Sequence, residues 1–135
     1  MTRLYMLDTD TCAFVLRRSS ELLLKRIQEV PIERQMISMV TLAELLYGVQ
    51  ESSRKKTNRA GVDAFVRHLT VKDWSRDAAE HYAEIRSALK KTGQMIGAND
   101  LMIAAHARSL DAAVVTNNVK DFGQVKGLKV ENWMQ

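Results

Sequence analysis

Short apolar runs alternate with longer segments in which apolar residues recur at helical spacing. The short runs predict buried strands at residues 4–7, 35–38, 69–71 and 112–115, with residues 129–130 adding a last one. The longer segments predict helices at residues 12–16, 21–30, 42–49, 58–68, 76–92 and 101–107. Pro31 closes the second helix, Ser75 caps the fifth and Gly93 ends it. Strands that alternate with helices predict a parallel α/β sheet between helical layers.

The length and composition fit a single compact domain over residues 1–135. The chain is 46% hydrophobic, which is enough for one core, and its one proline and six glycines form no linker. Its apolar runs are too short for a membrane span or a signal peptide, so a cytoplasmic location is expected. Cys12 has no partner in the chain and is interpreted as a small apolar residue in a reducing compartment.

Three acidic residues stand where predicted strands give way to helices: Asp8, Glu44 and Asp100. Because ligands gather beyond the carboxyl ends of parallel strands, acids from distant segments can meet there. Such a cluster would repel itself strongly without a cation. Oxygen-rich sites suit magnesium or manganese, so the three acids are candidate metal ligands and catalytic residues.

Each acid also has a structural explanation. Asp8 or Asp10 can cap the first helix, and Glu44, placed near the first turn of its helix, can pair with Thr41 in a capping box. Asp100 can stabilise a helix amino terminus through the helix dipole. Taken singly these explanations are favoured, whereas the conjunction of three such acids in one short chain favours a site.

The charge and the remaining polar residues narrow the chemistry. The formal net charge is +4, so basic residues outside the acidic cluster could hold phosphates, as in a nuclease. No Ser-His-Asp or Cys-His arrangement and no glycine-rich phosphate loop is visible, and a lone cysteine argues against zinc. His106 lies in an apolar helical run and is predicted to be a packing residue.

Four motifs in order resemble those of PIN-domain ribonucleases, and more closely those of the VapC toxins of bacterial VapBC toxin-antitoxin pairs. The resemblance spans residues 6–133. The motifs are Met-Leu-Asp-Thr-Asp at 6–10, Leu-Ala-Glu-Leu-Leu-Tyr-Gly at 42–48, Asn-Asp-Leu-Met-Ile-Ala-Ala-His-Ala at 99–107, and Val-Thr-Asn-Asn-Val-Lys-Asp-Phe at 115–122.

The resemblance implies a PIN-like three-layer sandwich with a mainly parallel central sheet. It implies an endoribonuclease that uses one or two Mg²⁺ or Mn²⁺ ions, with Asp8, Glu44 and Asp100 as the core acids. Two positions depart from the family pattern: Asn118 stands where many members have a fourth acid, and Asp10 where the toxins often have asparagine. Asp121 could compensate for Asn118.

Two supporting roles remain to be assigned. By the same resemblance, Thr116 matches the family's small hydroxyl residue that orients a carboxylate or a water. Asp10 is either an outer ligand or the helix cap, and the cap is favoured.

The partners follow from the same resemblance. They are structured RNA, with transfer RNA as the favoured class, a VapB-like antitoxin whose carboxyl-terminal segment lies in an apolar groove, and a second copy of the chain in a homodimer. Candidate groove residues, which are otherwise ordinary core, are Leu22, Leu23, Ile27, Leu45 and Leu46.

Two rival functions stay open. Asp8-Thr9-Asp10 after an apolar strand also resembles the nucleophile motif of haloacid-dehalogenase-type phosphatases, although later motifs of that family are missing. A catalytically inert module that binds RNA or antitoxin is the second rival, since Asn118 is neutral.

Overall fold

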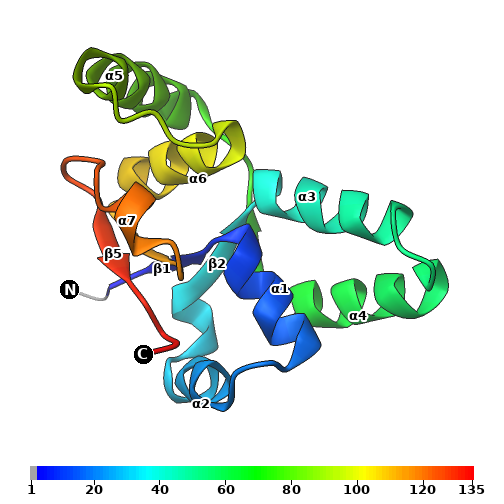
Figure 1. The fold of residues 1–135 in the computed structure, drawn as a ribbon. Coiled ribbons are helices and arrows are strands. Elements are labelled where there is room, and N and C mark those ends of the chain that lie inside the picture. The colour runs from blue at the N-terminus through cyan, green and yellow to red at the C-terminus, as the bar shows by residue number, and fades with distance from the viewer. Residues whose placement is uncertain (1–2) are drawn as a thin grey trace.

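A computed structural model describes residues 3–135 (Figure 1). In chain order its elements are β1 (Tyr5–Leu7), α1 (Thr9–Arg17), α2 (Glu21–Glu29), the 3₁₀ helix η1 (Ile32–Arg34), β2 (Gln35–Ser38), α3 (Met39–Gln50), α4 (Lys55–Arg67), β3 (Thr70–Lys72), α5 (Arg76–Thr92), α6 (Ala98–Ser109), β4 (Ala113–Val115), α7 (Val119–Phe122) and β5 (Lys129–Glu131). No helix in this part of the chain is both long and apolar enough to cross a membrane.

The strands of the described residues form one five-stranded sheet in the order β3-β2-β1-β4-β5. Every neighbouring pair is parallel, with Tyr5 opposite Gln35 on one side and Ala113 on the other. The predicted parallel α/β sheet is therefore confirmed. The order places β1 in the middle, so the residue that follows it lies between the ends of β2 and β4.

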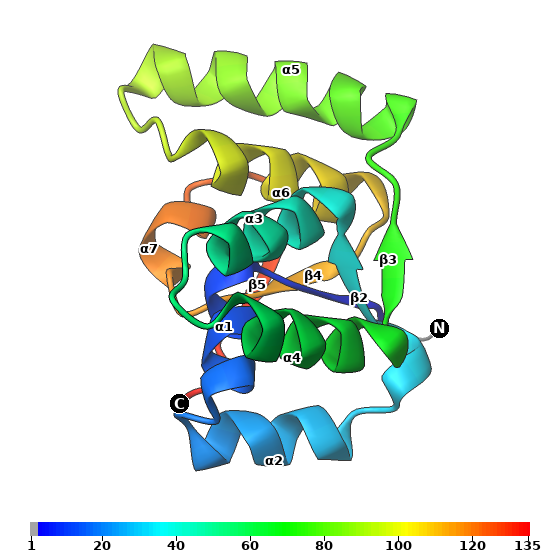
Figure 2. The same ribbon diagram turned by 90° about the vertical axis from the view of Figure 1, so that its right-hand side faces the viewer.

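Helices cover both faces of this sheet, as Figures 1 and 2 show. Successive strand residues point to opposite faces, so Met6 packs in the core beneath α5, α6 and α7, whereas Leu7 packs in the core beneath α1, α2, α3 and α4. Both side chains are fully buried. The two cores give the three-layer sandwich that the sequence predicts.

Most predicted elements are confirmed and their ends differ by a few residues. Ser75 caps α5 by accepting from the Ala78 N–H at 3.2 Å, and Gly93 ends the helix at φ 68°. The main correction concerns α3, which begins at Met39 rather than near residue 42. Two short helices, η1 and α7, were not predicted, because segments of three and four residues show no periodicity.

Candidate active site

The polar residues of interest stand at the carboxyl edge of the sheet. Asp8 directly follows β1 and Thr116 directly follows β4. The backbone ladder continues past the strands, because the Asp8 N–H donates to the Val115 carbonyl at 3.1 Å and the Thr116 N–H donates to the Glu131 carbonyl at 2.9 Å. Two segments more than a hundred residues apart therefore meet at one edge.

Asp8 is a buried carboxylate and also a helix cap. It is the N-cap of α1 and accepts from the Thr11 N–H at 2.9 Å, while its side chain is 2% exposed. Burial raises the pKa of Asp8, the side chains of Thr116 and Thr11 lower it through hydrogen bonds, and the charge of Asp10 raises it. The expectation that Asp10 caps this helix is wrong: Asp10 is exposed in the first turn of α1.

Glu44 does not belong to a capping box. Ser38 caps α3 by accepting from the Val40 N–H at 3.1 Å, so Thr41 lies inside the helix and Glu44 lies in its second turn. Both expectations, a place near the first turn and a pairing with Thr41, are therefore wrong. The Glu44 carboxylate instead accepts from the Thr9 hydroxyl at 2.6 Å and from the Asn99 amide at 2.8 Å.

Asp100 lies in the first turn of α6, where a carboxylate interacts favourably with the helix dipole, as predicted. Its pKa is nevertheless raised to about 6. Burial is the largest cause, followed by the charges of four other carboxylates, in the order Asp8, Asp10, Glu44 and Asp121. The acids from α1, α3, α6 and α7 thus share one electrostatic environment around Asp100.

Three residues after β4 are joined by hydrogen bonds. The Thr116 hydroxyl, which is buried, accepts from the Asn118 N–H at 2.8 Å. The Asn118 amide donates to the Asp121 carboxylate at 3.0 Å. Asn118 therefore fixes the orientation of Asp121, the carboxylate that lies next to it.

The donor set fits a hard cation in type and charge. All the candidate ligands are oxygen donors, and the pKa values of Asp8 and Asp100 are raised first by burial and then by the negative charge of neighbouring carboxylates. Within residues 3–135, however, no group of three acidic, histidine or cysteine side chains is close enough to hold a metal ion. Three protein ligands in direct contact are not required for Mg²⁺, because this ion usually keeps several waters and binds one or two carboxylates together with substrate phosphates.

The remaining candidates have structural surroundings. His106 is 1% exposed, its Nδ1 lies 2.8 Å from the Ser38 hydroxyl, and its pKa is lowered first by burial and then by Lys72. The packing role predicted for it is confirmed. Cys12 is fully buried, as expected of an apolar residue.

Sequence reasoning missed Thr9 and Asn99, the two residues that hold Glu44. Each is directly adjacent in sequence to a candidate acid, Thr9 to Asp8 and Asn99 to Asp100. That adjacency is the signal that could have found them. Their hydrogen bonds to Glu44 bridge 35 and 55 residues, which no local pattern reveals.

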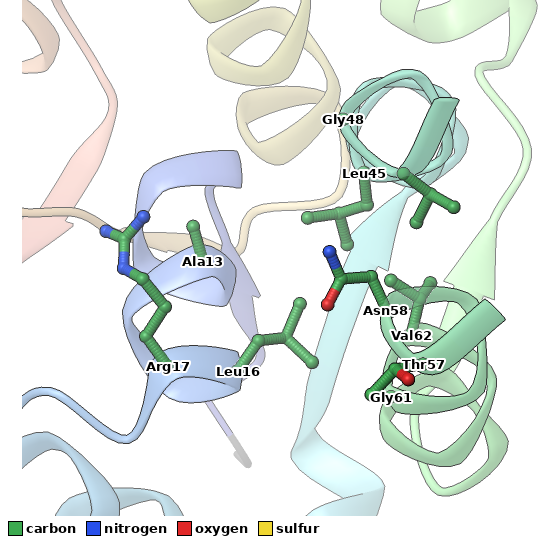
Figure 3. A pocket seen from close by; sticks show the side chains of 10 residues that line it. Ala13, Leu16, Arg17, Leu45, Gly48, Thr57, Asn58, Gly61 and Val62 are labelled. Atoms are coloured by element: carbon green, nitrogen blue, oxygen red, sulfur yellow. The ribbon is translucent and has the colours of Figure 1, made fainter. Parts of the chain in front are cut away.

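A separate pocket of about 490 Å³ lies between α1, α3 and α4 (Figure 3). Of the five leucine and isoleucine residues predicted to line a groove, it contains only Leu45. Leu23 is fully buried in the core, so the groove prediction is wrong for it. Ile27 and Leu46 are partly buried against that core and Leu22 is exposed, so for these three residues it stays a prediction. The other lining residues are Ala13, Leu16, Arg17, Gly48, Val49, Thr57, Asn58, Gly61 and Val62.

Comparisons with known proteins all find the same family. Residues 5–128 match the PIN domain family. The chain is 39% identical over 129 residues to the tRNA(fMet)-specific endonuclease VapC of Salmonella typhimurium, a match that covers 96% of this chain and 97% of that protein. It is 37% identical over 131 residues to Ribonuclease VapC2 of Rickettsia felis, covering 96% of this chain and 98% of that protein.

Solved structures give the same result. The structure of DNA-bound VapBC from Salmonella typhimurium superposes with a TM-score of 0.92 at 38% identity, covering 98% of this chain and 99% of that one. VapBC2 of Rickettsia felis, bound to a DNA fragment from its promoter, gives a TM-score of 0.88 at 35% identity, covering 96% and 98% of the two chains.

Proposed function

The chain belongs to the PIN-domain family, and we propose that it is a divalent-metal-dependent endoribonuclease that acts as the toxin of a toxin-antitoxin pair. The observation that carries the proposal is the raised pKa of Asp100, about 6, which is caused first by burial and then by the negative charges of Asp8, Asp10, Glu44 and Asp121. A fold keeps such mutually repelling charges when they bind a cation or a reacting group.

Asp8, Glu44 and Asp100 are the proposed metal ligands and catalytic residues. Mg²⁺ or Mn²⁺ is the proposed ion, because the donors are oxygens. When bound, such an ion neutralises charge that develops on the scissile phosphodiester and activates a water. Asp121 supplies the fourth acidic charge, in the orientation set by Asn118.

The chain's own residues prepare this site. The N–H of Thr11 fixes the direction of the Asp8 carboxylate, and the Thr116 side chain also hydrogen-bonds to it. Asp10 is exposed in the first turn of α1 and adds negative charge around Asp8 and Asp100. Its proposed role is therefore electrostatic.

RNA is the proposed substrate and transfer RNA its proposed class. The support is the similarity to the Salmonella typhimurium relative, a tRNA(fMet)-specific endonuclease. A net charge of +4 on a chain with an acidic site leaves a basic remainder, which favours binding to a polyanion.

A VapB-like antitoxin is the proposed partner, and its proposed docking site is the pocket between α1, α3 and α4 (Figure 3). Support comes from the similar structures, which are VapBC complexes. Leu16, Leu45 and Val62 offer an apolar lining, and Gly48 and Gly61 leave room for an inserted side chain, since a Cβ at either would meet nothing within 4 Å.

We further propose a single domain over residues 1–135, a cytoplasmic location and a homodimer. The one sheet with both faces covered supports the single domain. The location follows from the proposed substrate, because transfer RNA is a cytoplasmic molecule. Light scattering of the purified chain tests the dimer, and a mass near 15.3 kDa would contradict it.

The decisive experiment is RNA cleavage by the purified chain with Mn²⁺ or Mg²⁺ and with a chelator. The variants are Asp8→Asn, Glu44→Gln and Asp100→Asn, which keep shape and remove charge. Each is expected to lose activity by about 100-fold or more, equivalent to about 3 kcal/mol of transition-state stabilisation. Cleavage that persists in all three variants, or in the chelator, would contradict the proposal.

The same experiment addresses the rival functions. A parent chain that binds RNA without cutting it under any metal condition would support the inert module. The phosphatase alternative is not retained, because the PIN match covers residues 5–128 and includes the Asp8 motif.

A further inference from the structure

Both oxygens of the Glu44 carboxylate are already engaged by neighbouring helices. The Thr9 hydroxyl of α1 donates to Oε1 at 2.6 Å, and the Asn99 amide of α6 donates to Oε2 at 2.8 Å. Hydrogen bonds to a carboxylate are short and about twice as strong as neutral ones. Glu44 is therefore held in one orientation between two helices that come from distant parts of the chain.

The Thr9 hydroxyl also contacts Thr41, a residue of α3. Its oxygen lies 3.3 Å from the hydroxyl oxygen of Thr41, which is fully buried. A hydroxyl has one proton and two lone pairs. The Thr9 proton is committed to Glu44, which is at the shorter distance, and the Thr41 hydroxyl lies against the Thr9 oxygen.

Thr9 and Asn99 are neutral donors, so their hydrogen bonds do not cancel the negative charge of Glu44. Among the ion pairs of residues 3–135 none includes Glu44. A lysine or arginine in place of Thr9 or Asn99 would fix the carboxylate equally well but would cancel its charge. Neutral donors fix the orientation and leave the full negative charge for a cation.

The position of the donors links Glu44 to the other two acids. Thr9 follows Asp8 in sequence and Asn99 precedes Asp100, so each donor shares a backbone segment with another proposed ligand. We propose that Thr9 and Asn99, together called the Glu44 clamp, are positioning residues that set the Glu44 carboxylate relative to Asp8 and Asp100. This inference rests on the proposed metal-dependent function.

The test measures metal binding as well as activity. Thr9→Val and Asn99→Leu remove the donors with little change of volume, and Thr9→Ser keeps the hydroxyl. Titration of the metal-free chain with Mn²⁺ in a calorimeter gives the affinity. Both donor-less variants are expected to bind Mn²⁺ about 10-fold to 100-fold more weakly, as for other groups that orient metal ligands. Thr9→Ser should bind like the parent.

Steady-state RNA cleavage provides the second measurement. The clamp acts on the ligands and not on the RNA, so kcat at fixed Mn²⁺ should fall and KM for RNA should change little. Thr70→Val and Gln28→Leu are matched controls, since both residues are exposed, one on β3 and one on α2. The controls are expected to match the parent in affinity and in kcat.

Melting temperature separates these effects from misfolding. Asn99 is exposed, so Asn99→Leu should fold even if Thr9→Val does not. A folded Asn99→Leu chain with parental Mn²⁺ affinity and parental kcat would overturn the clamp while leaving the proposed function intact. A parent chain that binds no Mn²⁺ and cuts no RNA would overturn both.

Discussion

At the scale of single residues, capping and catalysis are not competing explanations for Asp8. The same carboxylate accepts from the Thr11 N–H and carries a pKa raised by burial. Asparagine is as good an N-cap as aspartate, whereas alanine is a poor one. The two roles can therefore be separated by substitution.

Asp8→Asn keeps the cap and removes the charge, whereas Asp8→Ala removes both. For the metal-free chain, urea unfolding should give Asp8→Asn a stability equal to or above that of the parent, because the folded state no longer holds a buried negative charge. Asp8→Ala should be less stable than Asp8→Asn by about 1 kcal/mol. Both should lack nuclease activity. Equal stability of the two variants would mean that the cap contributes nothing.

The raised pKa of Asp100 predicts that the stability of the fold depends on pH. Its pKa rises from 3.8 to about 6 on folding, so the folded chain binds this proton more tightly than the unfolded chain. The resulting stabilisation is complete below pH 4 and is lost as the pH rises from about 4 to 6.

The measurement compares the metal-free parent with Asp100→Asn by urea unfolding at several pH values. The stability of the variant relative to the parent should increase between pH 4 and 6 and stay constant above that range. Other groups with shifted pKa values, such as His106, are common to both proteins and their direct contributions cancel. A difference that does not change with pH would show that Asp100 is not in the environment described.

At the scale of the elements, the start of α3 decides what Glu44 does. Ser38 is both the last residue of β2 and the N-cap of α3, so strand and helix follow one another without a loop. The helix therefore begins a turn before its clearest apolar face, which comprises Leu42, Leu45 and Leu46. Glu44 consequently lies in the second turn, facing Thr9 of α1 and Asn99 of α6.

The pocket between α1, α3 and α4 makes a prediction about the antitoxin. Gly61→Leu should place a side chain in the pocket, since a Cβ there meets nothing within 4 Å. Binding of the VapB-like antitoxin should weaken by about 10-fold or more, equivalent to about 1.4 kcal/mol. RNA cleavage by the free variant should be unchanged.

Ala64→Leu is the control for that prediction. Ala64 is exposed on the same helix and does not line the pocket. Surface plasmon resonance with immobilised antitoxin measures the affinity of both variants for the antitoxin. Parental affinity of Gly61→Leu would place the antitoxin elsewhere.

At the scale of the whole molecule, one topology collects acids from four regions of the chain. Because β1 lies between β2 and β4, the ends of these three strands deliver Asp8, the start of α3 and Thr116 to one edge of the sheet. The first turn of α6 brings Asp100 to the same environment. The repulsion that results acts on the stability of the entire fold.

A cation should therefore stabilise the whole chain. At a free Mn²⁺ concentration of 100 times the dissociation constant, linkage predicts about 2.7 kcal/mol of added stability. Scanning calorimetry with Mn²⁺ and with a chelator should show this as a higher melting temperature. The double variant Asp8→Asn, Asp100→Asn should melt at the same temperature in both. An equal response of parent and double variant would locate the ion at another site.

The sequence by itself determined the strands, the six longer helices α1 to α6 and their alternation, because burial imposes a period on each of these elements. It also determined where Asp8 and Asp100 sit, since each lies within a residue or two of the end of an element. For the same reason it identified Ser75 and Gly93 as the ends of α5. Its errors on Asp10 and Thr41 arose because several neighbouring residues could cap the same helix, and only the backbone path selects one.

Tertiary structure alone decided which groups touch Glu44. Thr9 and Asn99 are 35 and 55 residues away from it, and their hydrogen bonds exist only once three helices have packed against the sheet. The hydrogen bond from Asn118 to Asp121 likewise depends on the short helix α7, which has no periodic signal. Local patterns record which face of an element is buried, whereas a site depends on contacts between elements, and those are fixed by packing.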